Sequence, residues 1–148
     1  MMIEALTCMA LNIYHEARNE ATVGQLAVAQ VVMNRVNDDR FPDTPCDVIY
    51  DGIHTKSGHP IRDRCQFSWY CDGLPDEARN KKAYETAYEN AKVVLEGHYY
   101  GIVDGATHYH ADYVSPRWAH HHTRIVKIDS HIFIDGTNHD STNMAVIS

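Results

Sequence analysis

The residues best suited to chemistry lie in the short segment 14–20, Tyr-His-Glu-Ala-Arg-Asn-Glu. In the preceding stretch, apolar residues recur at steps of three and four from Ile3 to Ala17, which predicts an amphipathic α-helix. Glu16 lies roughly 100° from the centre of that apolar stripe, at its edge. A carboxylate at such an edge loses part of its hydration, which raises its pKa and suits it to donate a proton. The segment therefore predicts a general acid at Glu16; the alternative is a solvated surface glutamate near a helix end.

The residues after Glu16 predict a tight corner between two helices. Asn19 is a residue type that tolerates the left-handed conformation at a helix end. The segment Thr22–Gln25 has the form of a capping box, which predicts the start of a second helix over residues 23–37. This second helix is apolar nearly all round, as expected for a helix enclosed by the rest of the fold.

Five motifs, taken in chain order, resemble the SleB-like cell wall hydrolases, the family of the spore-cortex-lytic enzymes. They are Tyr14–Glu20, Gly24–Val36, Arg40–Pro42, Cys65–Trp69 and Gly105–His110. The resemblance covers nearly the whole chain. At position 19 the family usually has Gly where this chain has Asn, and Asn is the next-best residue for a left-handed backbone.

The resemblance implies a mainly helical, lysozyme-like α+β catalytic domain with a small antiparallel hairpin or sheet near the C-terminus. It also implies cleavage of peptidoglycan glycan strands at the β-1,4 bond between N-acetylmuramic acid and N-acetylglucosamine, with Glu16 as the acid. Hydrolysis needs a second carboxylate about 5 to 9.5 Å away. Glu20 is the nearest in sequence, but it follows the expected helix end, and a residue four positions from Glu16 would share its helix face and not flank a sugar. No motif favours Asp72 or Asp112. We therefore favour a lytic transglycosylase, in which the C6 hydroxyl of muramic acid attacks, over a hydrolytic muramidase.

Substrate contacts are expected from three parts of the chain. The candidates are Arg18, Gln66, Phe67, Ser68, Trp69, Tyr109 and His110. The segment 66–70 places amide, hydroxyl and aromatic groups close together, the mixture that binds sugars; the alternative is that its aromatic rings belong to the core. Arg18 is alternatively a salt-bridge partner near a helix C-terminus.

Two other classes of function compete with a glycosidase. A metal-dependent wall hydrolase could use the histidines, six of which lie in the segment 108–131. However, His15-Glu16 has no second histidine four residues on, as a zinc-protease helix requires. The second competitor is a non-catalytic wall-binding module, which has no need of a proton donor at a helical corner. We expect no metal and no cofactor.

The remaining pattern predicts the scaffold. A third helix is expected over residues 76–96, after a Pro- and Gly-rich loop over 37–76. A short strand over 106–110 is expected to place Ala106, His108 and His110 on one face, with Thr107 and Tyr109 on the other. A hairpin is expected from 125–128 and 131–134. Residues 1–136 are expected to form one catalytic domain, and 137–148 a polar tail.

Composition limits the partners. The net charge of −7 over 148 residues, with scattered Lys and Arg, argues against nucleic-acid binding. No stretch is apolar enough to span a membrane. The N-terminus lacks a basic n-region and leads directly into the first helix, so we expect no signal peptide. We expect a monomer made in the cytoplasm that acts on the wall or periplasm, in the manner of a phage or prophage lysin released by a separate membrane lesion.

Four cysteines, Cys8, Cys46, Cys65 and Cys71, allow three fully paired arrangements. Synthesis in a reducing cytosol favours free thiols, and later exposure to the periplasm would permit a disulfide across a loop. The spacing from Cys65 to Cys71 does not match a zinc knuckle.

Overall fold

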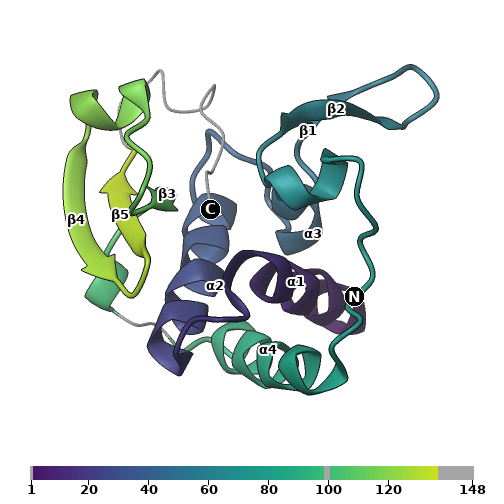
Figure 1. The fold of residues 1–148 in the computed structure, drawn as a ribbon, viewed down its shortest axis with the longest axis horizontal. Coiled ribbons are helices and arrows are strands. Elements are labelled where there is room, and N and C mark those ends of the chain that lie inside the picture. The colour runs from purple at the N-terminus through teal and green to yellow at the C-terminus, as the bar shows by residue number, and fades with distance from the viewer. Residues whose placement is uncertain (1, 99–100, 137–148) are drawn as a thin grey trace.

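Three helices form the centre of the molecule. A computed structural model describes residues 2–98 and 101–136. In it α1 (Met2–Ala17), α2 (Thr22–Val36) and α4 (Lys81–Leu95) pack against one another, as Figure 1 shows. Most residues of α2 are buried, because its apolar side chains extend around the whole helix and meet neighbours on every side. The expectation that the second helix is enclosed is confirmed.

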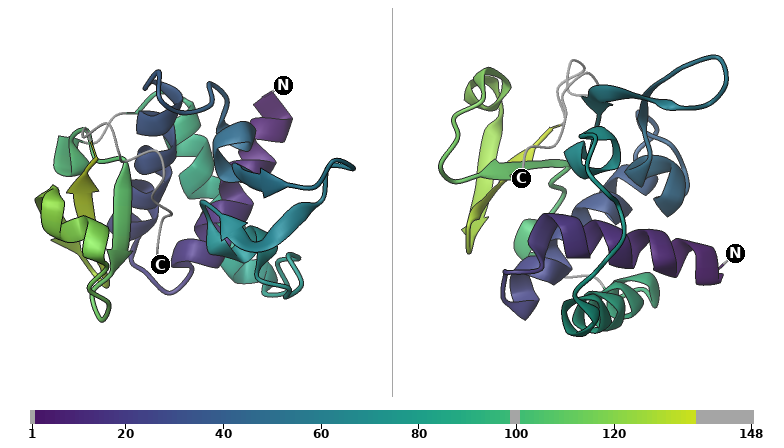
Figure 2. Two further views of the ribbon diagram at one scale, coloured as in Figure 1. Left: turned by 90° about the horizontal axis from the view of Figure 1, so that it is seen from above. Right: turned by 45° about the vertical axis from the view of Figure 1, so that its right-hand side comes forward.

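A three-stranded antiparallel sheet stands beside the helices, and it confirms the α+β class. Its strands are β3 (His108–Ala111), β4 (Thr123–Ile128) and β5 (His131–Asp135), in the order β3-β5-β4. Two short 3-10 helices, η2 (Gly101–Val103) and η3 (Arg117–His121), precede β3 and β4. Figure 2 shows the sheet as a separate layer on one side of the helices. The predicted hairpin is the β4–β5 pair, and the polar tail predicted after residue 136 lies outside the described residues.

The Pro- and Gly-rich loop predicted between the second and third helices contains four short elements. They are α3 (Pro45–Ile49), β1 (Gly52–His54), β2 (Pro60–Cys65) and the 3-10 helix η1 (Ser68–Cys71). The β1–β2 hairpin projects away from the helices (Figure 1). The expectation that this region lacks long regular elements is confirmed.

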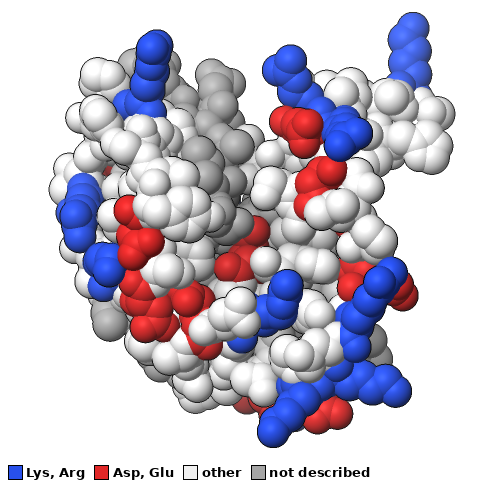
Figure 3. All heavy atoms as spheres, in the orientation of Figure 1, with Lys and Arg blue, Asp and Glu red and all other residues white. Residues whose placement is uncertain are grey.

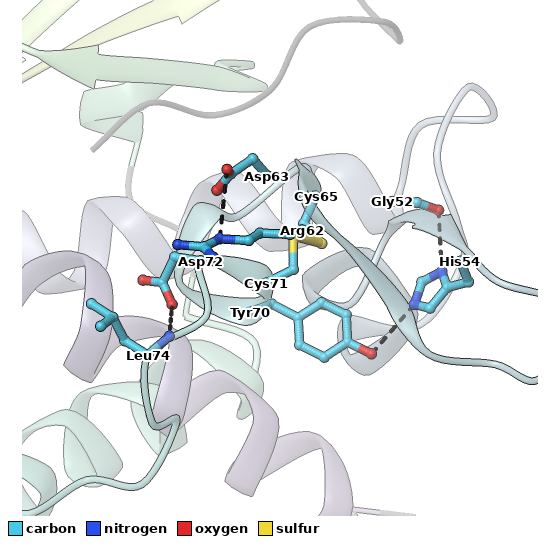
Figure 4. Close-up of a disulfide and its surroundings, with 9 residues drawn as sticks. All are labelled: Gly52, His54, Arg62, Asp63, Cys65, Tyr70, Cys71, Asp72 and Leu74. Carbon is cyan, nitrogen blue, oxygen red and sulfur yellow. Dashed lines mark hydrogen bonds and ion pairs between the residues drawn. A yellow bond between two sulfur atoms is a disulfide. The ribbon is translucent and has the colours of Figure 1, made fainter.

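Two disulfides select one of the three pairings that the sequence allowed. Cys8–Cys46 joins α1 to α3, and Cys65–Cys71 joins the end of β2 to η1. Figure 4 shows the second bridge closing the small loop between the hairpin and η1. Because this loop contains residues 66–70, the bridge restrains the segment expected to contact substrate.

The corner between α1 and α2 forms differently from the prediction. Asn19 is not among the residues with positive φ, and Thr22 does not cap α2. The backbone N–H of Ala21, the N-cap residue, instead donates to Asp129 Oδ2 at 2.9 Å. A residue 108 positions away therefore replaces the local capping box, and it ties the β4–β5 turn to the helix corner.

The third long helix begins later than predicted. Its N-cap is Asn80, whose side chain accepts a hydrogen bond from the Ala83 N–H at 3.0 Å, so residues 76–80 lie outside the helix. These residues instead run past the C-terminal end of α1, where the Asn80 N–H donates to the Tyr14 hydroxyl at 3.1 Å.

The surface carries charges of both signs in separate areas. In Figure 3 acidic atoms gather where the sheet meets the helices, and basic atoms stand over α4 and along the β1–β2 hairpin. Within the described residues, no helix has the length and apolar character that crossing a membrane requires.

Candidate active site

Glu16 lies in the last turn of α1, at the corner where the chain turns toward α2. Its side chain is held against β3, because the Tyr109 hydroxyl donates a hydrogen bond to Glu16 Oε1. Glu16 is only 7% exposed, and Tyr109 is completely buried. The carboxyl group is therefore more enclosed than its predicted position at the edge of the apolar stripe indicated.

The buried Tyr109 hydroxyl is a permanent donor. Burial, together with the neighbouring Glu16 carboxylate, holds the pKa of Tyr109 well above its usual value of 10.0. The phenol therefore stays protonated and donates a hydrogen bond to the carboxyl group. Sequence analysis placed Tyr109 among the substrate contacts. Its side chain has no exposed surface and meets Glu16, and a role in binding substrate stays a prediction.

Glu16 separates two cavities. The larger cavity, of about 390 Å³, lies toward η1 and the loop that follows it, and the smaller cavity, of about 200 Å³, lies toward the sheet. Both are lined by His15, Glu16 and Arg18. Together they form what we call the active-site groove, which passes Glu16 on both sides and is open to solvent. A chain of sugars lying along it would place one linkage beside the carboxyl group.

The wall of the larger cavity is built by Trp69 on η1. Its ring stacks on His15 with 4.6 Å between centroids, and its Nε1–H donates to Asn12 Oδ1 at 2.8 Å. Trp69 is largely buried and shows one edge to the cavity, whereas Ser68 beside it is exposed. These two predicted contact residues do line the groove, and their role in binding stays a prediction.

Gln66 and Phe67 lie behind this wall and do not line either cavity of the groove. Phe67 is completely buried in the core, because the apolar ring gains more from burial than from exposure in the loop, and its assignment as a substrate contact stays a prediction. The Gln66 side chain accepts a hydrogen bond from Arg35 Nη1 at 3.0 Å. Both residues therefore support the groove from within.

Arg35 is the residue that sequence analysis missed. It is the largest fully buried side chain, and its guanidinium donates to the Thr107 carbonyl at 2.7 Å and lies over the Phe41 ring. Burial lowers the pKa of Arg35 to about 10. Arg35 thus connects α2 to both the residue before β3 and the loop before η1. A charged residue in a helix that is apolar all round was the signal for this role.

The strand that carries Tyr109 begins at His108, two residues later than predicted. The expected alternation holds, since His108 and His110 both lie near Trp118 on η3 while Tyr109 points to α1. His110 is 5% exposed and does not line the groove, and its assignment as a substrate contact stays a prediction. Both faces of this strand are covered, which the alternation alone could not reveal.

Arg18 is exposed at the boundary between the two cavities. Its guanidinium lies over the Tyr14 ring at 4.9 Å, and Nη1 donates to the Tyr14 carbonyl at 3.3 Å. No acidic partner holds it among the ion pairs of the described residues. Its charge is therefore available to the groove, as the sequence prediction requires.

Three further carboxylates line the groove, and each is already engaged. Glu77 lines the larger cavity, and its Oε1 accepts a hydrogen bond from Arg79 Nε at 3.0 Å. Glu20 lines the smaller cavity, but its Oε1 accepts hydrogen bonds from the Ser130 N–H at 3.0 Å and hydroxyl at 2.6 Å and lies 3.1 Å from His131 Nδ1. Asp72 lines the larger cavity, and its Oδ1 accepts from the Leu74 N–H at 2.9 Å.

The histidines considered as metal ligands are dispersed. His15 stacks on Trp69, whereas His108 and His110 lie beside Trp118. Across residues 2–98 and 101–136, no group of three or more His, Cys, Asp or Glu side chains is arranged to hold a metal ion. The site consists of the nearly buried Glu16 carboxyl group beside an open groove.

Comparison with known proteins identifies the family. Residues 19–134 match the family described as cell wall hydrolase, and the chain belongs to this family. The matched segment begins three residues after Glu16 and contains Tyr109.

Among curated relatives, the spore cortex-lytic enzyme of Halalkalibacterium halodurans is 32% identical over 130 residues, which are 84% of this chain and 33% of that protein. The spore cortex-lytic enzyme of Bacillus cereus is 32% identical over 129 residues, 84% of this chain and 42% of that protein. The chain therefore spans about a third to two fifths of the length of these relatives.

Solved structures of catalytic domains match over most of their length. One is the catalytic domain of the germination-specific lytic transglycosylase SleB from Bacillus anthracis, with a TM-score of 0.66 and 28% identity, covering 88% of this chain and 93% of that domain. The other is the catalytic domain of Bacillus cereus SleB, with a TM-score of 0.63 and 27% identity, covering 88% and 89%. The fold is that of the SleB catalytic domain.

Proposed function

We propose that this chain cleaves the glycan strands of peptidoglycan as a lytic transglycosylase, at the β-1,4 bond between N-acetylmuramic acid and N-acetylglucosamine. The observation that carries the proposal is the position of Glu16, a buried carboxyl group between two cavities with a fixed donor at its back. Membership of the cell wall hydrolase family and likeness to a lytic transglycosylase domain support the substrate and the reaction.

In the proposed reaction Glu16 acts first as an acid and then as a base. Its proton passes to the glycosidic oxygen as the bond from that oxygen to C1 of muramic acid breaks, and the C6 hydroxyl attacks C1. The Glu16 carboxylate then takes the hydroxyl proton, which leaves a 1,6-anhydro end and a free 4-hydroxyl on N-acetylglucosamine. Glu16 is nearly buried, and the Tyr109 hydroxyl donates to its Oε1, so the carboxyl group is held in place for both proton transfers.

Transglycosylation is preferred over hydrolysis because of what surrounds the other carboxylates. A hydrolase needs a second carboxylate that is free to act as a nucleophile or to activate water. Glu20 accepts two hydrogen bonds from Ser130 that join the β4–β5 turn to the helix corner, and Asp72 accepts one within its own loop. Glu77, the third carboxylate that lines the groove, is paired with Arg79. One glutamate is sufficient when the substrate supplies its own nucleophile.

We further propose that the protein acts as a monomer outside the reducing cytosol, on the wall or in the periplasm. Its two disulfides support this, since such bonds persist in oxidising compartments. Release in the manner of a phage lysin remains part of this proposal.

The function is tested by Glu16→Gln, which keeps the size of the side chain and removes its proton exchange. The expected result is that cleavage of purified peptidoglycan is lost while cosedimentation with peptidoglycan persists. Glu77→Gln is the matched control, because Glu77 lines the larger cavity but is exposed and paired with Arg79 at 3.0 Å. Retained cleavage by folded Glu16→Gln would exclude Glu16 as the acid. Absence of cleavage by the wild type, with binding intact, would identify a wall-binding module.

A further inference from the structure

A third cavity, of about 340 Å³, lies next to the groove, between the β1–β2 hairpin and the loop after η1. We call it the hairpin cavity. Arg62, Tyr70, Gly73 and Asp76 line it, and so does Leu74, which also lines the larger cavity of the groove. A branch leaving a glycan chain in the groove would therefore enter the hairpin cavity past Leu74.

The walls of this cavity are fixed by covalent and polar contacts. The Cys65–Cys71 disulfide ties β2 to η1, and the Tyr70 hydroxyl lies 3.3 Å from His54 Nε2 on β1 (Figure 4). Tyr70 also packs on Tyr50, with 4.6 Å between ring centroids. The hairpin is thus held at a defined distance from η1, and the space between them is a built feature.

Arg62 is positioned over the loop that closes the cavity. Figure 4 shows its side chain crossing the disulfide with the guanidinium above the Asp72–Leu74 loop. A Cβ atom at Gly73 would lie 3.2 Å from Arg62 Cζ, so the glycine leaves the room that the guanidinium occupies. Gly73 also has a φ of +83°, a conformation that favours glycine.

Arg62 keeps most of its capacity to bind an anion. Its one ion pair among the described residues is with Asp63 at 4.0 Å, and its side chain is 76% exposed. The hairpin is also basic within an acidic chain: residues 52–65 contain Lys56, Arg62 and Arg64 against one acidic residue, Asp63. An anionic group approaching the cavity therefore meets a local excess of positive charge.

Asp76 gives the same cavity a negative charge. No Lys or Arg forms an ion pair with it among the described residues, and burial raises the pKa of its carboxyl group, which the nearby His15 partly offsets. Its carboxylate would therefore be stabilised by an incoming cation. A guanidinium and a carboxylate in one cavity, with the Tyr70 ring between the hairpin and η1, suit a short peptide that carries both a carboxylate and a free amine.

On the basis of the function proposed above, we infer that the hairpin cavity binds the peptide stem carried by muramic acid, with Arg62 holding a stem carboxylate and Asp76 a stem amine. Stem peptides are the acidic, amine-bearing branches of the glycan chain, and the cavity opens from the groove where such a branch would leave it. The cavity thereby selects strands that carry stems over bare strands.

The test compares two substrates: peptidoglycan strands with their stems, and strands from which an amidase has removed them. Arg62→Gln is expected to lower kcat/KM about tenfold on strands with stems, the effect of one lost charge-assisted hydrogen bond. On bare strands it should cleave as the wild type does. Arg64→Gln is the matched control, because it removes the same charge from the same strand at a residue that does not line the cavity.

A second arm measures binding of a soluble stem peptide by calorimetry, which does not depend on cleavage. We expect the wild type and Arg64→Gln to bind the peptide with equal affinity. Arg62→Gln should bind it about tenfold more weakly. Equal losses on both substrates, or equal effects of the two arginine substitutions, would overturn the assignment. If the wild type cleaves neither substrate, the proposed function fails, and the calorimetry still decides whether the cavity binds stems.

Discussion

The hydrogen bond from Tyr109 to Glu16 can be removed with little change in shape by Tyr109→Phe. The ring is completely buried and packs against His131 and Phe133, contacts that phenylalanine keeps. The hydroxyl bonds more strongly to a carboxylate than to a neutral carboxyl, and Glu16 becomes a carboxylate as it gives up its proton. The hydrogen bond therefore stabilises the transition state more than the ground state.

A hydrogen bond to a charged group contributes about 1.5–3 kcal/mol, so kcat/KM is expected to fall about 10- to 100-fold. Turbidity loss of purified peptidoglycan measures this fall in rate. Tyr88→Phe, on α4 and outside the groove, is the control.

An unchanged rate in a Tyr109→Phe variant that unfolds at the wild-type temperature would refute this reasoning. A fall in rate matched by an equal fall for Tyr88→Phe would assign the effect of Tyr109→Phe to packing alone.

Three further predictions concern stability. Arg35→Met leaves the Thr107 carbonyl without its buried donor and should lower the free energy of unfolding by about 2–5 kcal/mol in urea; a loss below about 1 kcal/mol would contradict this. Burial lowers the pKa of His131, so the unfolded chain takes up the proton more readily; stability should fall as pH drops below about 6.5, and His131→Gln should flatten that slope. Replacing Cys8 and Cys46 by Ser opens a bridge between residues 38 positions apart and should cost about 4 kcal/mol, read from denaturation midpoints.

The long helices were predictable because their signal is local. Apolar residues at steps of three and four identified α1, and the unbroken apolar character of α2 indicated its burial. The errors arose where a distant residue replaced a local one: the Asp129 side chain replaced the capping box at Thr22. Sequence proximity could not indicate a partner 108 residues away.

In the site, too, the features set by local sequence were predictable and those set by distant residues were not. The corner motif pointed to Glu16, and the structure places this residue between two cavities. The motif around Tyr109 identified the strand that faces Glu16, but only the packing shows that the Tyr109 hydroxyl donates to Glu16. In the segment 66–69, Ser68 and Trp69 line the groove, whereas Phe67 fills the core. One run of residues therefore serves two purposes that composition does not separate.

The most direct test of the central claim is mass spectrometry of the fragments released from purified peptidoglycan. For the wild type, with or without EDTA, we expect 1,6-anhydro-muropeptides, each lighter by one water than the hydrolysed fragment. Glu16→Gln should release none. Reducing-end fragments in place of anhydro ends would contradict transglycosylation and indicate hydrolysis with a second carboxylate, and loss of products on adding EDTA would contradict a mechanism that depends on Glu16 alone.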